Sequence, residues 1–84
     1  MIIVEVTWED ACSESLDQPI ELIQNLKPII RHNVGYLTKE NDTEIVLSAG
    51  ISEKAADDKD TFTDNLVIPR SMIKWVQMLW EKDA

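Results

Sequence analysis

Apolar and polar residues alternate most regularly between residues 29 and 47, and this pattern predicts a β-hairpin. Ile30, Val34 and Tyr36 share one side of a period-two repeat rich in β-branched and aromatic residues, which is typical of a strand. Residues 39–43 are polar, and the Asn and Asp among them accept turn geometry. Residues 44–47 then resume an apolar run, so we expect two antiparallel strands joined by a short turn.

A glycine interrupts the first arm of this hairpin. Gly35 has no Cβ, so its place in a strand indicates either sharp coiling of the strand or close approach of another segment. A small, strongly curved sheet is therefore the predicted centre of the fold.

The chain before the hairpin predicts one strand and one helix. Residues 2–8 carry β-branched and aromatic side chains, with Val4 and Val6 on one face, and predict the first strand. Residues 9–15 are polar and without periodicity, which is typical of a loop.

The predicted helix covers residues 17–27. Asp17 can cap it, and Pro19 suits its first turn. One stripe of the helix would carry Ile20, Ile23 and Leu26. Pro28 would end the helix, because the residue before a proline is pushed away from α geometry.

After the hairpin, the pattern predicts an extension of the second strand over residues 48–51 and a solvated acidic loop over residues 52–64. Phe62 can anchor the far end of this loop. Residues 65–69 are a short apolar segment that ends at proline, which predicts a further strand.

Residues 70–81 are compatible with two structures. Ile73, Val76 and Trp80 suit one face of a helix capped by Ser71, and the intrinsic propensities of Met, Gln, Leu, Lys and Glu favour that helix. The same residues also alternate with period two, which favours a strand that closes a small barrel. Both alternatives stay open at this point.

The composition of the 84-residue chain, with 44% hydrophobic residues, indicates a single folded domain over residues 1–84. The expected fold class is α+β. Its sheet would have four to five antiparallel strands, would be strongly curved, and could close like a barrel. One helix near residues 17–27 and a C-terminal helix or closing strand complete this prediction.

A formal net charge of −8 narrows the classes of partner. Residues 1–26 contain no Lys or Arg, and binding to nucleic acid depends on such residues displacing counterions from phosphates. We therefore expect no direct nucleic-acid binding and a protein partner with a basic surface. Glu5 interrupts the apolar start too early for a signal peptide or a membrane span, so we expect no membrane association.

Candidate catalytic and metal-binding residues are sparse. Cys12, the single cysteine, fits a reducing compartment and could pair with His32 as nucleophile and base, with Asp10 or Asp17 orienting the imidazole. No basic residue near Cys12 in sequence would lower its pKa, however. We therefore expect no enzymatic activity and no cofactor.

The acidic residues of the predicted loop raise the question of calcium. The stretch containing Asp57, Asp58, Asp60 and Asp64 lacks the glycine and the terminal glutamate of an EF-hand loop, so we expect no metal site there.

The aromatic residues near the C-terminus exceed what one side of a small element can bury. Trp75 and Trp80 lie close to Met72 and Met78, so part of this apolar surface is expected either to close the core or to meet another chain. A homo-oligomer is one outcome of the second alternative.

Short motifs in the sequence resemble those of two known groups of proteins. Residues 34–37 (VGYL), followed by an EIVL segment and by residues 67–79 (VIPRSMIKWVQML), resemble the two-part pattern of Sm-like small β-barrels. The Pro69-Arg70-Ser71 turn departs from that pattern, because it lacks the Arg-Gly pair through which such proteins commonly contact RNA. RNA binding is therefore not implied for this chain.

The second resemblance covers most of the chain. VTWEDA at residues 6–11, VGYL at 34–37, IVL at 45–47 and IPRSMI at 68–73 occur in an order and spacing similar to a family of small bacteriophage proteins. The shared motifs are Trp-x-Asp-Ala, Val-Gly-aromatic-Leu and Ile-Pro-basic-x-x-Ile. The family implies no catalytic residue. It implies a phage origin and the host cell cytoplasm, in a class that includes many small inhibitors of host defence.

Charge and resemblance together predict a non-enzymatic, acidic, anti-CRISPR-like protein that occludes a basic, nucleic-acid-binding surface of a host defence complex. Clustered carboxylates raise association rates toward a positive surface, and a packed aromatic slows release. The residues expected to bind the partner are Glu9, Asp10, Glu14, Asp57, Asp58, Asp60, Trp75 and Trp80.

The alternative function is an oligomer that sequesters a nucleotide signalling molecule of host defence between its subunits. Arg31, Arg70 or Lys74 would hold phosphates, and Tyr36 or Trp75 would stack on the base. No glycine-rich phosphate loop supports this alternative.

Overall fold

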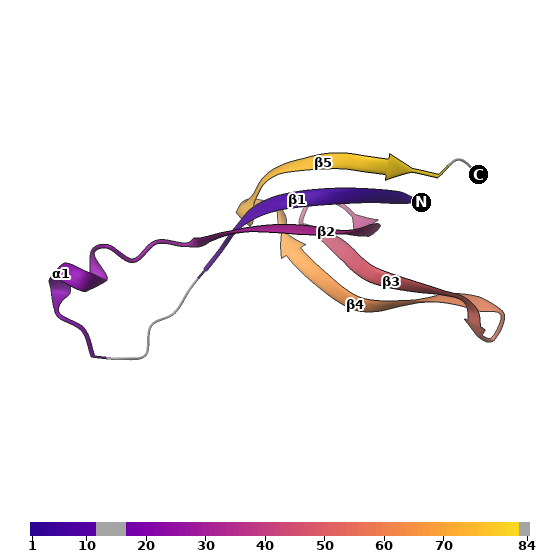
Figure 1. Cartoon of the computed structure of the whole chain (residues 1–84), viewed down its shortest axis with the longest axis horizontal. Helices are drawn as coiled ribbons and strands as arrows, with labels where there is room; N and C mark the ends of the chain where they lie inside the picture. Colours follow the sequence, from indigo (N-terminus) through magenta and orange to yellow (C-terminus); the bar gives the residue numbers. More distant parts are fainter. Residues whose placement is uncertain (12–16, 83–84) are drawn as a thin grey trace.

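The computed structural model describes residues 1–11 and 17–82, and they form one open antiparallel sheet (Figure 1). Its strands are β1 (Ile2–Asp10), β2 (Ile29–Glu40), β3 (Glu44–Ala56), β4 (Lys59–Pro69) and β5 (Ile73–Glu81). Their spatial order is β4-β3-β2-β1-β5, so β4 and β5 are the two edges. The predicted small antiparallel sheet is confirmed, but the chain is mostly β rather than α+β.

The predicted central hairpin is confirmed as β2 and β3. Leu37 lies opposite Leu47, and the connecting turn is Asn41–Thr43 rather than the five polar residues expected. Of the two alternatives predicted for Gly35, sharp coiling and close approach of another segment, the structure shows the close approach. A Cβ atom added there would lie 2.9 Å from the backbone oxygen of Ser48 and 3.2 Å from the Cβ of Leu47. Glycine at this position lets the two strands approach each other at the bend.

The predicted helix over residues 17–27 is wrong in length. Only one turn, α1 (Ile20–Ile23), is helical, and its N-cap is Pro19 without a side-chain capping bond rather than Asp17. The apolar stripe of the predicted helix does not pack against the core, since Ile20 is 64% exposed and Ile23 and Leu26 are each 50% exposed. Short helices gain most of their stability from packing an apolar face, and this segment projects away from the sheet (Figure 1).

The predicted acidic loop over residues 52–64 is also wrong. These residues continue β3 and β4 as a two-stranded extension that turns at Asp57 and Asp58. Both aspartates have positive φ, 48° and 58°, as a two-residue hairpin turn requires at its central positions. Polar composition here reflects exposure of both strand faces, so it was no guide to secondary structure.

Of the two alternatives for residues 70–81, the structure selects the strand. A 3₁₀ turn, η1 (Arg70–Met72), follows Pro69, and β5 then pairs antiparallel with the free edge of β1. Val76 lies opposite Val6 and Met78 opposite Val4. The sheet does not close into a barrel, because β4 and β5 stay at opposite edges of the sheet order.

The core fills the concave side of the curved sheet. Its buried side chains come from β1, β3 and β4, namely Val4, Val6, Trp8, Ile45, Leu47 and Ile68. Ile2, Leu37, Leu66, Met72 and Ile73 pack against this cluster. Trp8 donates from Nε1 to Oδ1 of Asn33 over 2.8 Å, which satisfies the indole N–H inside the core.

Hydrogen bonds hold the β2–β3 turn in one conformation. Asn41 accepts at Oδ1 from the backbone N–H groups of Thr43 and Glu44, both at 2.9 Å. Glu44 accepts from Lys39 Nζ at 2.7 Å, from the Thr43 hydroxyl and from the Asn41 amide. These hydrogen bonds, that from Lys39 foremost, lower the pKa of Glu44 to about 2.

The turn should make stability depend on pH. Because the pKa of Glu44 is lower in the folded chain than its ordinary value of 4.5, the unfolded chain binds more protons between those values. The contribution of Glu44 is therefore complete above about pH 4.5 and disappears as pH falls toward 2. We expect Glu44→Gln to flatten the dependence of the urea midpoint on pH in this window. Asp42→Asn, in the same turn, is the control, and an unchanged slope in Glu44→Gln would contradict this role.

Candidate partner-binding surface

A group of exposed acidic side chains lies on the extension of β3 and β4, residues 52–64, which we call the acidic arm. It carries five acidic residues and two lysines. Asp57 and Asp58 form its turn, and residues 52–60 are all exposed. Figure 1 shows the arm extending from the curved sheet at the end away from α1. The acidic arm therefore presents its carboxylates to solvent on a protruding element.

Local hydrogen bonding and irregular backbone shape the acidic arm. Asp60 accepts at Oδ1 from the backbone N–H of Lys54 over 3.1 Å, across the hairpin. Lys54 and Asp64 have positive φ, 49° and 51°, and a register shift lies between Ser52 and Ala56. Such irregularities increase the twist of a two-stranded ribbon.

The acidic residues at the end of β1 differ from those of the arm in having cationic partners. Asp10 Oδ2 lies 2.5 Å from Arg31 Nε, and Glu9 Oε1 lies 2.9 Å from Lys74 Nζ. These ion pairs offset the two negative charges locally. Of the other predicted partner-binding residues, Glu14 lies outside the described residues.

The two predicted tryptophans lie on β5 and are about half exposed, Trp75 at 57% and Trp80 at 48%. Trp75 is opposite Thr7 on β1, and Trp80 is opposite Ile3. They therefore lie near opposite ends of the strand.

Trp80 shares a cavity of about 250 Å³ with Asp60 of the acidic arm. The other lining residues are Met1, Tyr36, Ile51, Glu53 and Lys82. Asp60 and Trp80 were both predicted to bind the partner, and here the fold brings them together. Glu53 was missed, because nothing in its local sequence shows that it lines a cavity together with the end of β5.

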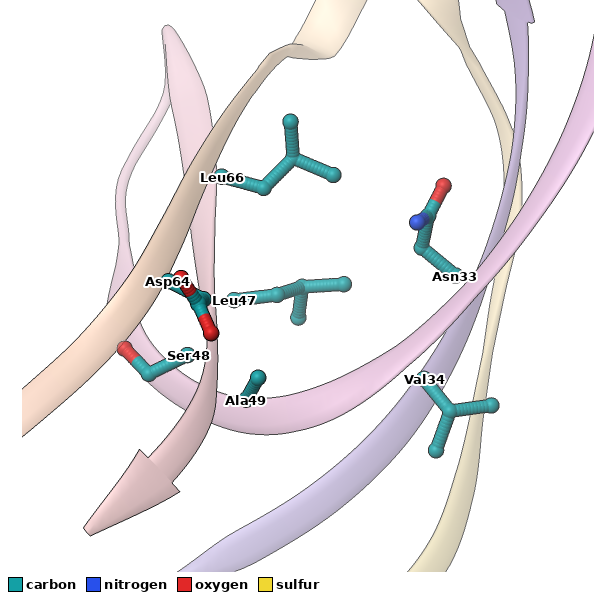
Figure 2. A pocket seen from close by; sticks show the side chains of 7 residues that line it. All are labelled: Asn33, Val34, Leu47, Ser48, Ala49, Asp64 and Leu66. Carbon is teal, nitrogen blue, oxygen red and sulfur yellow. The ribbon is translucent and has the colours of Figure 1, made fainter.

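A second cavity, of about 230 Å³, opens on the concave side of the sheet (Figure 2). Leu47 and Leu66 extend into it from β3 and β4, and Asn33 faces them from β2. The Asn33 amide oxygen accepts from Trp8, and Ser48 and Asp64 are the other polar residues that line the cavity. The sequence did not predict that these residues meet, because the curvature of the sheet brings them together.

The predicted catalytic constellation is only partly covered by the structure. His32 Nδ1 and the Thr7 hydroxyl share a hydrogen bond of 2.9 Å, and Asp10 pairs with Arg31. Cys12 lies outside the described residues. Within residues 1–11 and 17–82, no three His, Cys, Asp or Glu side chains gather in a way that could hold a metal ion.

The cations proposed for phosphate binding lie in two places and carry ion pairs. Arg31 and Lys74 pair with Asp10 and Glu9 near the end of β1. Arg70 donates from Nε to the Asn41 carbonyl over 2.9 Å at the β2–β3 turn, and its Nη2 lies 3.6 Å from Glu40 Oε2. Arg31, Lys74 and Arg70 therefore do not gather around one aromatic ring, as the nucleotide-binding alternative requires.

No protein-family model, curated protein or solved structure matches the chain. The part of the chain that the structure describes contains no helix with the length and apolar character of a membrane-spanning segment.

Proposed function

We propose that the protein is a non-enzymatic, phage-encoded inhibitor that binds a basic surface of a host defence complex in the host cytoplasm. By covering the surface on which that complex holds nucleic acid, it would act as an anti-CRISPR-like protein does, by occlusion. The acidic arm is the part that would engage the positive surface.

The observation that supports this proposal is the uneven distribution of charge over the fold. Near the end of β1, Glu9 and Asp10 are paired with Lys74 and Arg31. The acidic arm instead places five acidic residues and two lysines on one protruding hairpin. Concentrated charge of one sign attracts a partner of opposite charge and speeds their encounter.

Trp80 would add contact area next to these carboxylates. It lines the same cavity as Asp60, Glu53 and Tyr36. A lysine or arginine side chain of the partner could place its cation near the carboxylates and its stem against an aromatic face. Aromatic side chains at such positions commonly slow dissociation.

Capture from host lysate tests the proposal. We expect the immobilised wild-type chain to retain a nucleic-acid-binding host complex at low salt and to release it as salt rises, because added ions screen charges beyond about 8–10 Å. Mass spectrometry identifies the retained proteins. A chain in which Asp57, Asp58 and Asp60 are replaced by Asn is the matched bait.

Two results would contradict occlusion. One is retention of the same complex by both baits, and the other is a captured complex that still binds its nucleic acid while the inhibitor is bound. A co-purified small nucleotide without a protein partner would instead support the alternative function.

A further inference from the structure

Strand β5 is an edge strand with apolar side chains on both of its faces. Residues directly opposite in an antiparallel pair share a face. Val76 and Met78 therefore lie on the core side with Val6 and Val4, whereas Trp75 and Trp80 lie on the other side with Thr7 and Ile3. Apart from Ile73, which packs against the core, the large apolar side chains of β5 are exposed, from Val76 at 38% to Met78 at 58%.

The two edges of the sheet differ in their protection against further pairing. Charged residues, proline and irregular backbone discourage pairing at an edge. β4 has Asp60, Asp64 with its positive φ, and Pro69, which has no N–H to donate. β5 has two register shifts against β1, but residues 75–78 between them pair regularly and carry no charge. β5 is thus the less protected edge.

The distribution of charge singles out the same strand. Residues 65–80 contain no Asp or Glu in a chain that has sixteen of them, and they include Arg70 and Lys74. Two copies with a net charge of −8 each repel one another at long range. The surface on which copies can approach with the least repulsion is therefore the one built from β5.

We propose that β5 is a self-association surface, on which an edge strand of a second copy of this chain docks. Half-exposed Trp75 and Trp80 present about 200 Å² together. With Val76, Met78, Leu79 and the strand backbone, two copies would bury on the order of 1,000 Å², the lower limit for a specific interface. The unpaired backbone groups of the edge supply the directional contacts.

Sedimentation velocity of the purified full chain tests this surface. The wild-type chain should sediment as a dimer or larger species at high micromolar concentration. Its tryptophan emission should shift to shorter wavelength with concentration, as Trp75 and Trp80 leave water. A wild-type chain that stays monomeric would overturn the proposal.

Lysine substitutions locate the contact. Met78→Lys and Leu79→Lys should each weaken association by at least about tenfold. They lower the net negative charge, so the loss cannot come from added long-range repulsion between the acidic chains, and the lysine stem can still cover the neighbouring strand. Val34→Lys is the matched control, because Val34 is 55% exposed on the inner strand β2. Folding is checked by the urea midpoint.

Salt separates this proposal from the proposed function. Screening reduces repulsion between like-charged copies, so self-association should strengthen as salt rises, whereas binding to a basic partner should weaken. Two results would overturn the proposed self-association surface. One is that folded Met78→Lys and Leu79→Lys chains associate like the wild type, and the other is that only the Val34→Lys chain dissociates. Neither result depends on whether a host partner is captured.

Discussion

Replacing Gly35 with valine is expected to lower the free energy of unfolding by about 1–3 kcal/mol. The added Cβ would lie 2.9 Å from the backbone oxygen of Ser48, and a backbone atom cannot rotate away as a side chain can. To relieve this contact, β2 would have to move away from β3 at this position. Urea denaturation measures the change.

Gly50→Val is the matched control for this prediction. A Cβ at Gly50 would lie 2.8 Å from Thr63 Oγ1, a side-chain hydroxyl that can change rotamer. Valine opposite threonine is also a favourable cross-strand pair. We therefore expect a smaller loss at Gly50, and equal losses at the two positions would show that the approach of β2 to β3 is not the cause.

Removing the charges at the tip of the acidic arm should slow association with the captured basic partner by about tenfold or more at low salt. The variant replaces Asp57, Asp58 and Asp60 with Asn. Asparagine accepts the positive φ of the turn as aspartate does, and it can accept the hydrogen bond from the Lys54 N–H. The arm should therefore keep its shape while it loses three negative charges.

Surface plasmon resonance with the captured partner gives both rate constants. We expect the dissociation rate to change by less than about threefold, because exposed charges act mainly on the encounter. The control replaces Asp17 with Asn, Glu21 with Gln and Asp42 with Asn, which gives the same net charge at other sites. If this control slows association equally, total charge rather than the acidic arm steers the partner.

The local pattern was sufficient for the strands that have one face on the core. In β1, buried Val4 and Val6 alternate with half-buried Ile3 and Glu5, as in a strand with one face on the core. In the first half of β2, alternation predicted the strand but not its inner face, because Ile30 and Val34 are exposed while Asn33 contacts Trp8. Gly35 was recognisable because a glycine inside a strand has few other causes. The acidic character of residues 52–64 was also visible directly, since charge depends on composition and not on fold.

The sequence by itself thus determined the central hairpin, a special backbone role for Gly35 and the excess of negative charge. Only the tertiary structure decided the other elements. Residues 17–27 have a helical stripe but no surface to pack on, so one turn forms. The final segment is a strand because β1 has a free edge for it. Asp60 and Trp80 line one cavity because long-range strand pairing places them there, and strand pairing cannot be read from the local sequence.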